Sequence, residues 1–442
     1  MRRPEKPPVS FANLGRVVYD IIDNKEVLSK LNQIEKDYPY WEEFRNRVKD
    51  ISIEPDTLWK YIINFPRSFA ITNIKLDDLP SYKFKYNITP DILKRLHKFD
   101  ISLGGLFEGS SLIAPGDRNK FLVSSLMDEA IASAQLDGAI LPYEEAKEML
   151  LTERKPRDNS EAMAVGNFHA MKRVIELKEM QMSPELILEL YGILIQHDPK
   201  RSKTALGFRD TDDMKIGDIN TGDIYYTVPG FEIVEKAINE ICHFANNNET
   251  EEFIHPIIKA AIIHYLILYT CPFNEANNRL ARVVFYWYLV THRYWLVEYL
   301  SISKAIQKAE ENYMRQYLYS NYDDNDLTYF IKYYLKTLQT ALEGLKDHIK
   351  LKMDEKNKLY HLFRSENINE RQADIIKELI SDSHKTFTIK EVENKYGTVY
   401  QTARTDLLYL VKEGYLEQKE TGKKMVFFRS ANFEEKIKKP AI

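Results

Sequence analysis

The chain of 442 residues has a formal net charge of −4, is 12% aromatic and contains only 16 glycines. This length and composition predict a globular protein of two or three domains and exclude a largely disordered chain. The slight negative charge excludes a protein that binds nucleic acid or membranes with its whole surface, so DNA binding would need a local patch.

The cysteine content and the apolar runs of the sequence indicate the cellular compartment of the protein. Only Cys242 and Cys271 occur, so no disulfide framework is expected and a reducing environment is favoured. The first residues, MRRPEKPPVS, lack the apolar core of a signal peptide. The longest apolar run, residues 260–273, is too short to span a bilayer. We expect a cytoplasmic protein that makes no membrane contact.

Residues 1–114 have mostly helical patterning with irregular joints, which predicts an N-terminal helical region. Within it, residues 89–105 begin with a Thr-Pro helix-entry signal and end at two glycines.

Residues 115–345 have a stronger helical pattern, which predicts a helical bundle. Expected helices cover 119–138, which ends at the C-cap residue Gly138, and then 159–180 and 183–197. A hairpin is expected at 214–230, where two strand-like runs flank Asn-Thr-Gly-Asp. Residues 252–270 and 278–296 are apolar on nearly every side and therefore belong in the middle of the bundle.

Residues 346–366 are charged and helical without a sharp apolar stripe, which predicts a connector. Residues 367–432 then show three helical patterns and two short strands around Thr-Gly-Lys-Lys. This order is typical of a winged helix-turn-helix domain.

A polar loop, TCPFNEANNRLAR at residues 270–282, joins the two most apolar helices. If the second helix begins near Asn277, its unpaired N–H groups and the guanidinium groups of Arg279 and Arg282 suit a phosphate. Glu275 is placed to hold a divalent ion, and Asn277 to orient an oxygen. These residues predict a phosphate or nucleotide site. The alternative is that both arginines only cap or pair with neighbouring helices.

The loop resembles the signature of the Fic (Fic/DOC) family, His-Pro-Phe-x-Asp/Glu-Gly-Asn-Gly-Arg-x-x-Arg. The helix at 254–270, the hairpin at 215–229 and the helices at 301–335 also resemble the family's, so the similarity covers roughly residues 50–345. It implies a mainly α fold, a Fic helical bundle with a β-hairpin flap, followed by a small C-terminal α/β winged-helix domain. The residues that match the signature are Pro272, Phe273, Glu275, Asn277, Arg279 and Arg282.

The resemblance also implies a chemistry. Fic enzymes typically transfer AMP from ATP to a hydroxyl group of a target protein with Mg²⁺. It therefore implies ATP and Mg²⁺ as cofactors and an unknown target protein as partner. By resemblance Glu275 holds the metal, Asn277 and the position of Asn278 belong to the phosphate cradle, and Arg279 and Arg282 grip the phosphates.

Three positions depart from the signature. Cys271 replaces the histidine that acts as general base, a role that contributes about 10²–10⁴-fold to the rate. The nearby helix N-terminus and arginines are expected to lower the pKa of its thiol, and a thiolate is a better nucleophile than base. A covalent role and an inert buried cysteine are the alternatives. Ala276 and Asn278 replace glycines, and asparagine adopts the left-handed backbone more easily than alanine. Standard AMP transfer is therefore expected to be impaired.

Residues 129–138 resemble the family's autoinhibitory motif, Ser/Thr-x-x-x-Glu-Gly/Asn. Ser133 and Gly138 match, whereas Asp137 replaces the glutamate that pairs with the second arginine, here Arg282. We call this pairing of Asp137 with Arg282 the clasp. Because aspartate is one methylene shorter than glutamate, the clasp is expected to be loose. The alternative is that Asp137 is only a residue of the last helical turn.

The expected hairpin resembles the family's flap, which aligns a target segment by strand addition. Its candidate residues are Lys215, Ile216, Tyr225 and Tyr226. The two tyrosines suit contacts to adenine or to a partner, and strand packing explains them equally well.

Residues 398–416 resemble recognition helices of winged-helix regulators. Candidate DNA contacts in the helix and the following hairpin are Tyr400, Gln401, Thr402, Arg404, Lys423 and Lys424. The region has only a modest basic excess, so docking of a protein or a homodimer contact remains an alternative.

Together these features predict a nucleotide-binding Fic-fold protein with weakened adenylyltransferase activity and a regulatory DNA-binding domain. One alternative is an active transferase with altered chemistry. The other is a transcription regulator that uses the Fic core as a scaffold.

Overall fold

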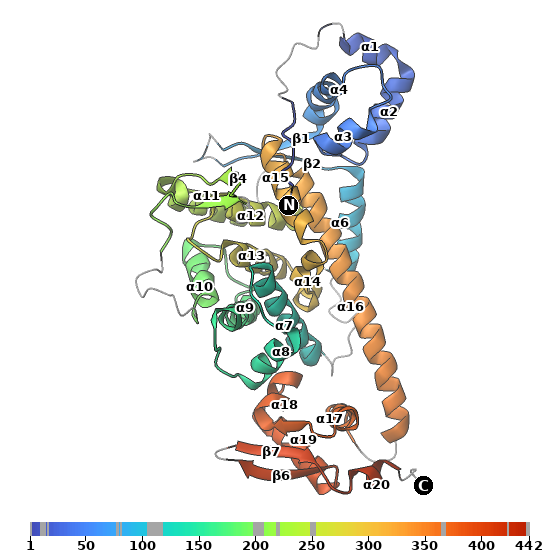
Figure 1. Ribbon diagram of the computed structural model, residues 1–442, viewed down its shortest axis with the longest axis vertical. Coiled ribbons are helices and arrows are strands. Elements are labelled where there is room, and N and C mark those ends of the chain that lie inside the picture. Colours follow the sequence, from blue (N-terminus) through green and yellow to red (C-terminus); the bar gives the residue numbers. More distant parts are fainter. Residues whose placement is uncertain are drawn as a thin grey trace.

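The computed structural model describes residues 2–8, 15, 17–76, 79, 82–103, 118–197, 207–217, 222–247, 253–363, 368–421 and 424–438. Within these ranges the chain is mainly helical with three small antiparallel sheets, which confirms the predicted fold class (Figure 1). Nowhere in these ranges is a helix both long enough and apolar enough to cross a membrane.

Residues 17–70 form an N-terminal helical unit with a hydrophobic core of its own, built around Phe44, Leu58 and Trp59. Phe84 and Leu96, which also lie in the predicted region 1–114, pack in the central core instead. The elements of the unit are α1 (Val17–Asp23), α2 (Lys25–Glu35), α3 (Trp41–Arg47), α4 (Pro55–Ile62), η1 (Ile63–Arg67) and α5 (Ser68–Ala70).

A short hairpin, β1 (Ile71–Ile74) and β2 (Phe84–Asn87), leads from this unit into α6 (Pro90–Ser102). The Thr-Pro start of α6 is confirmed, because the Thr89 side chain accepts a hydrogen bond from the Ile92 amide at 3.3 Å. The two glycines expected to end the helix lie outside the described residues.

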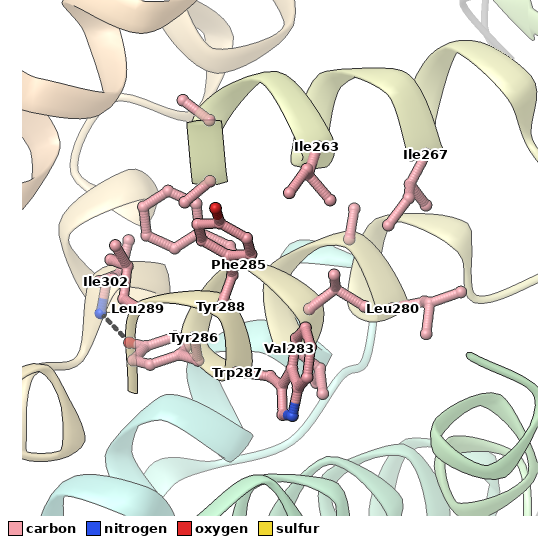
Figure 2. Close-up of a cluster of buried hydrophobic side chains, with 14 of the residues drawn as sticks. Ile263, Ile267, Leu280, Val283, Phe285, Tyr286, Trp287, Tyr288, Leu289 and Ile302 are labelled. Atoms are coloured by element: carbon pink, nitrogen blue, oxygen red, sulfur yellow. Dashed lines mark hydrogen bonds between the residues drawn. The ribbon is translucent and has the colours of Figure 1, made fainter. Parts of the chain in front are cut away.

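The central bundle surrounds two buried helices that pack along each other, α12 and α13 (Figure 1). Figure 2 shows apolar side chains of both helices in contact, with the Tyr286 hydroxyl accepting a 2.7 Å hydrogen bond from the Ile302 amide. Burial of almost every side chain explains their all-round apolar sequence. The bundle comprises α7 (Arg118–Leu136), α8 (Tyr143–Thr152), α9 (Asn159–Glu176), α10 (Pro184–Leu194), η3 (Phe231–Ile233), α11 (Val234–Asn246), α12 (Pro256–Thr270), α13 (Asn277–Thr291), η4 (Trp295–Tyr299), α14 (Ile302–Gln307) and α15 (Glu310–Tyr322).

The predicted hairpin is present as β3 (Lys215–Gly217) and β4 (Ile224–Thr227), which pair antiparallel with an irregularity between Ile216 and Gly217. Residues 218–221 at its tip are outside the described part of the chain.

The helix α16 (Thr328–Phe363) runs from the bundle to the C-terminal unit (Figure 1). Of the predicted helical connector at 346–366, the part up to Phe363 continues the helix that begins at Thr328. Moreover Leu345 and Ile349 are buried in the central core.

The C-terminal unit has its own core, including Ile376, Leu407 and Phe427. It contains α17 (Glu370–Ser381), β5 (Thr386–Thr388), α18 (Ile389–Tyr396), α19 (Tyr400–Lys412), β6 (Leu416–Thr421), β7 (Lys424–Arg429) and α20 (Phe433–Lys438). The three expected helices and the hairpin are confirmed, and β5 adds a third strand in the order β5-β7-β6. Assignment as a winged helix remains a prediction.

Helix α18 docks the C-terminal unit onto α7 and α8. The Asn119 side chain donates to the Gly397 carbonyl at 2.9 Å, and the Asn394 side chain donates to the Leu151 carbonyl at 2.9 Å. The unit therefore touches the helix that carries the clasp residues.

Candidate functional site

The polar loop turns sharply between α12 and α13. Cys271 and Ala276 both have left-handed backbones, with φ of +44° and +59°. Inside the loop the Asn277 amide donates to the Phe273 carbonyl at 2.6 Å, and its oxygen accepts from the Phe273 amide at 3.0 Å. The side chain of Asn277 therefore closes the loop on itself rather than pointing a free amide at a ligand.

Cys271 is buried, and its thiol donates to the Leu268 carbonyl at 3.0 Å. Burial raises the pKa of this thiol to about 12, while Arg209 acts to lower it. The expected thiolate is therefore wrong, because the loss of water around the sulfur outweighs the nearby positive charge. At neutral pH Cys271 carries its proton and accepts none.

The two replaced glycines differ in consequence. Ala276 adopts the left-handed backbone, which costs an L-residue other than glycine about 1–2 kcal/mol. Asn278 lies within α13, and its φ is not positive. Asn278 therefore does not need a left-handed backbone. The backbone strain lies at Ala276 instead.

Arg279 and Arg282 are buried at the start of α13, and both contact the carboxylate of Asp137. Arg279 Nε lies 3.2 Å from Asp137 Oδ2, and one terminal nitrogen of Arg282 lies 3.0 Å from Asp137 Oδ1. Arg282 also donates to the hydroxyl and the carbonyl of Ser133, both at 2.9 Å. The shorter aspartate thus spans both arginines, and the clasp is closed rather than loose.

The end of α7 presents Asp137 to these arginines. Gly138 has φ of +87°, and the Ala139 amide donates to the Ala134 carbonyl at 3.0 Å, which is a Schellman end. The expected role of Gly138 as a C-cap is confirmed. Asp137 lies just beyond the last helical residue, where its side chain is free to turn toward α13.

Sequence reasoning missed Glu129, which lies two turns before Asp137 on α7. Its Oε2 accepts hydrogen bonds from the Tyr286 hydroxyl at 2.9 Å and the Ser303 amide at 2.8 Å. Burial raises the pKa of Glu129, whereas these hydrogen bonds act to lower it. Glu129, Ser133 and Asp137 are four residues apart, so one face of α7 forms a polar seam with α13. This four-residue spacing of polar side chains was the sequence signal that could have identified Glu129.

Arg209 was also missed. Its buried guanidinium donates to the Cys271 carbonyl at 2.8 Å and to the carbonyl of Pro229, which follows the flap. Its amide donates to the Pro272 carbonyl at 2.9 Å. Arg209 therefore holds the loop and the base of the flap together. The signal was a lone arginine after an aromatic residue shortly before the hairpin.

The flap tyrosines face the protein interior. Tyr225 and Tyr226 are buried, and the Tyr226 hydroxyl donates to the Tyr269 carbonyl at 3.1 Å. Strand packing, one of the two interpretations, describes them best. Lys215 is exposed and Ile216 is half-buried on β3.

Glu275 is exposed at the surface of the loop, before the first turn of α13. A single carboxylate beside phosphate oxygens is a usual magnesium environment, so its position fits the metal role that the resemblance implies. Within the part of the chain that is described, no three His, Cys, Asp or Glu side chains gather into a metal site.

The candidate DNA contacts gather at the start of α19 and in the hairpin. Tyr400, Gln401 and Arg404 are exposed, and Thr402 is half-buried. Lys424 is exposed at the start of β7, whereas Lys423 lies outside the described residues.

Comparisons with known proteins found similarity to one family. Residues 181–289 match the family model of the Fic/DOC family. Similar solved structures include a Fic family protein from Desulfovibrio desulfuricans G20, with 15% identity, coverage of 78% of this chain and 98% of that chain, and a TM-score of 0.47. A fragment of Fic-1 from C. elegans is 15% identical, with 78% and 91% of the chains covered and a TM-score of 0.48.

A Fic domain containing signaling protein from Bacteroides thetaiotaomicron is 17% identical, with 58% and 96% of the chains covered and a TM-score of 0.44. The comparison with curated proteins found no match. The matched residues 181–289 contain the flap, α12, the polar loop and most of α13. Residues 181–289 therefore match the Fic/DOC family, and this match covers about a quarter of the chain.

Proposed function

We propose that the loop between α12 and α13 binds the phosphates of ATP with Mg²⁺, and that Asp137 competes with them for the same arginines. One observation carries the proposal: two buried guanidinium groups at the start of a helix share a single carboxylate. A carboxylate and a phosphate present the same charged oxygens to arginine. The helix N-terminus adds N–H groups that favour an anion.

Each residue then has a role. Arg279 and Arg282 would bind phosphate oxygens after Asp137 moves away, and Glu275 would hold the magnesium ion. Bound ATP would supply the AMP group that Fic enzymes transfer to protein hydroxyls. Because Cys271 keeps its proton, it cannot take the proton of an attacking hydroxyl. We infer that AMP transfer is weak, and that an active transferase with altered chemistry is less well supported.

The test is calorimetric titration with ATP and MgCl₂. Substituting Asp137→Asn is expected to tighten binding about 10–100-fold, because charge-assisted hydrogen bonds of about 1.5–3 kcal/mol no longer oppose the phosphate. Adding Arg279→Ala should abolish that gain.

Asp128→Asn is the matched control, because Asp128 lies on the same helix but pairs with Lys304 outside the clasp. It should leave ATP affinity unchanged. If the Asp137→Asn chain keeps its melting temperature and still binds no ATP, the nucleotide proposal is wrong.

A second candidate concerns the C-terminal unit. We infer that it is a winged helix-turn-helix domain that binds DNA through α19, because Tyr400, Gln401 and Arg404 are exposed along the start of that helix. Retention of duplex DNA by the full chain should weaken with Arg404→Ala. Retention that is absent, or that Arg404→Ala does not change, would favour a protein-docking role for the unit.

A further inference from the structure

Residues 2–8 form neither helix nor strand, yet they are held against the protein between the N-terminal helical unit and α15 (Figure 1). Pro4 in this segment is buried. The side chains that hold it come from α15 and from the start of α3. We call them the Tyr322 surface, which consists of Tyr40, Glu42, Arg45 and Tyr322.

The Tyr322 surface binds both backbone groups of Glu5, the amide and the carbonyl. The Glu5 amide donates to Glu42 Oε1 at 3.1 Å, and the Tyr40 hydroxyl donates to the Glu5 carbonyl at 2.7 Å. The Tyr40 ring is fixed in advance, because it stacks on Tyr319 with the ring centroids 3.7 Å apart. A donor and an acceptor that together bind the backbone of one residue are a feature of peptide-binding sites.

The Tyr322 surface also contacts side chains of the bound segment. Arg3 and Lys6 lie over the Tyr322 ring at 5.7 and 5.2 Å from its centroid, and Glu5 pairs with Arg45 at 2.6 Å. Arg3 and Lys6 are three residues apart, which is the repeat of a polyproline II helix. The neighbouring prolines favour that conformation, so both cations reach the same ring.

Tyr322 connects this surface to the flap. Its hydroxyl accepts a hydrogen bond from Arg3 Nε at 3.1 Å and donates to the Tyr225 carbonyl of β4 at 2.9 Å. A peptide bound to the Tyr322 surface and the flap strand β4 therefore both form a hydrogen bond with the Tyr322 hydroxyl.

We propose that the Tyr322 surface is a binding site for an extended, proline-containing peptide with two cations three residues apart and an acidic residue between them. In this structure the chain's own residues 2–8 occupy the site. A segment of the same chemistry in another protein would have to displace them. This proposal does not depend on nucleotide binding, so each can fail without the other.

The test uses the full chain with Arg3→Glu, Glu5→Pro and Lys6→Glu, which remove the side-chain contacts and the amide hydrogen bond of the tethered segment and leave only the Tyr40 hydrogen bond to the carbonyl of residue 5. A fluorescent peptide of sequence RRPEKPP is titrated and its anisotropy measured. The substituted chain should bind the peptide at least about tenfold more tightly than the unsubstituted chain, because a tethered segment competes at an effective concentration on the order of millimolar. A peptide of the same composition in reordered sequence should bind at least about tenfold more weakly.

The controls separate the surface from the fold. In the substituted chain, Tyr40→Phe should weaken peptide binding at least about fivefold, whereas Tyr61→Phe, a hydroxyl loss elsewhere in the N-terminal unit, should not. The proposal is overturned if the substituted chain keeps its melting temperature and binds no peptide, or if it binds the reordered peptide equally well. In the unsubstituted chain the Glu5 amide should exchange its hydrogen at least about tenfold more slowly than a free amide. Exchange at the free rate would also overturn the proposal.

Discussion

Replacing Cys271 with histidine in the Asp137→Asn chain is expected to raise AMP transfer from ATP by about 10²–10⁴-fold, the contribution of a positioned general base. The thiol of Cys271, with its pKa raised to about 12 by burial, holds its proton at neutral pH. A neutral imidazole accepts a proton at that pH. The left-handed backbone at position 271 does not prevent the change, because histidine is among the residues enriched at positive φ.

The measurement is incorporation of labelled AMP into protein, with the purified chain alone and with cell extract as a source of acceptors. Cys271→Ala in the same background should show no gain, because it removes the thiol without providing a base. If the histidine variant binds ATP and still transfers nothing, the missing base is not what limits the reaction. A wild-type activity that Cys271→Ala abolishes would instead support the transferase with altered chemistry.

Linear spacing predicted the parts of the site that lie on single helices. Arg279 and Arg282 are three residues apart on α13, so one helical turn brings both to Asp137. The burial of α12 and α13 likewise follows from sequences that are apolar on every side. These features depend on the period of the helix and on little else.

Properties that depend on contacts between distant segments could not be predicted in the same way. The pKa of Cys271 was expected to fall because two arginines are close in sequence, but burial determines its direction. Arg209 donates to the Cys271 carbonyl although the two residues are 62 positions apart in the sequence, and no local sequence pattern predicts that contact. The sequence marked Ala276 as the less favourable glycine replacement if its φ is positive, but only the structure shows that Ala276 is left-handed while Asn278 is helical.

The polar seam between α7 and α13 leads to the second large effect. Glu129→Ala is expected to lower the free energy of unfolding of the central bundle by about 3–5 kcal/mol, because it removes a buried hydrogen-bond acceptor and leaves a cavity. The alanine would leave the Ser303 amide without its acceptor and would open a cavity beside Tyr286. Glu129→Gln keeps the volume and one acceptor, so a smaller loss of about 1–3 kcal/mol is expected.

Thermal and urea unfolding measure this loss, with Glu145→Ala on the exposed face of α8 as the matched control. A loss under about 1 kcal/mol, equal to that of the control, would mean that Glu129 does not anchor α7. The anchor matters for the clasp because Glu129, Ser133 and Asp137 share one face of the helix. Glu129 holds α7 to Tyr286, one turn beyond Arg282 on α13, so it sets the register in which Asp137 meets both arginines. A chain that loses Glu129 should therefore lose the closed clasp as well.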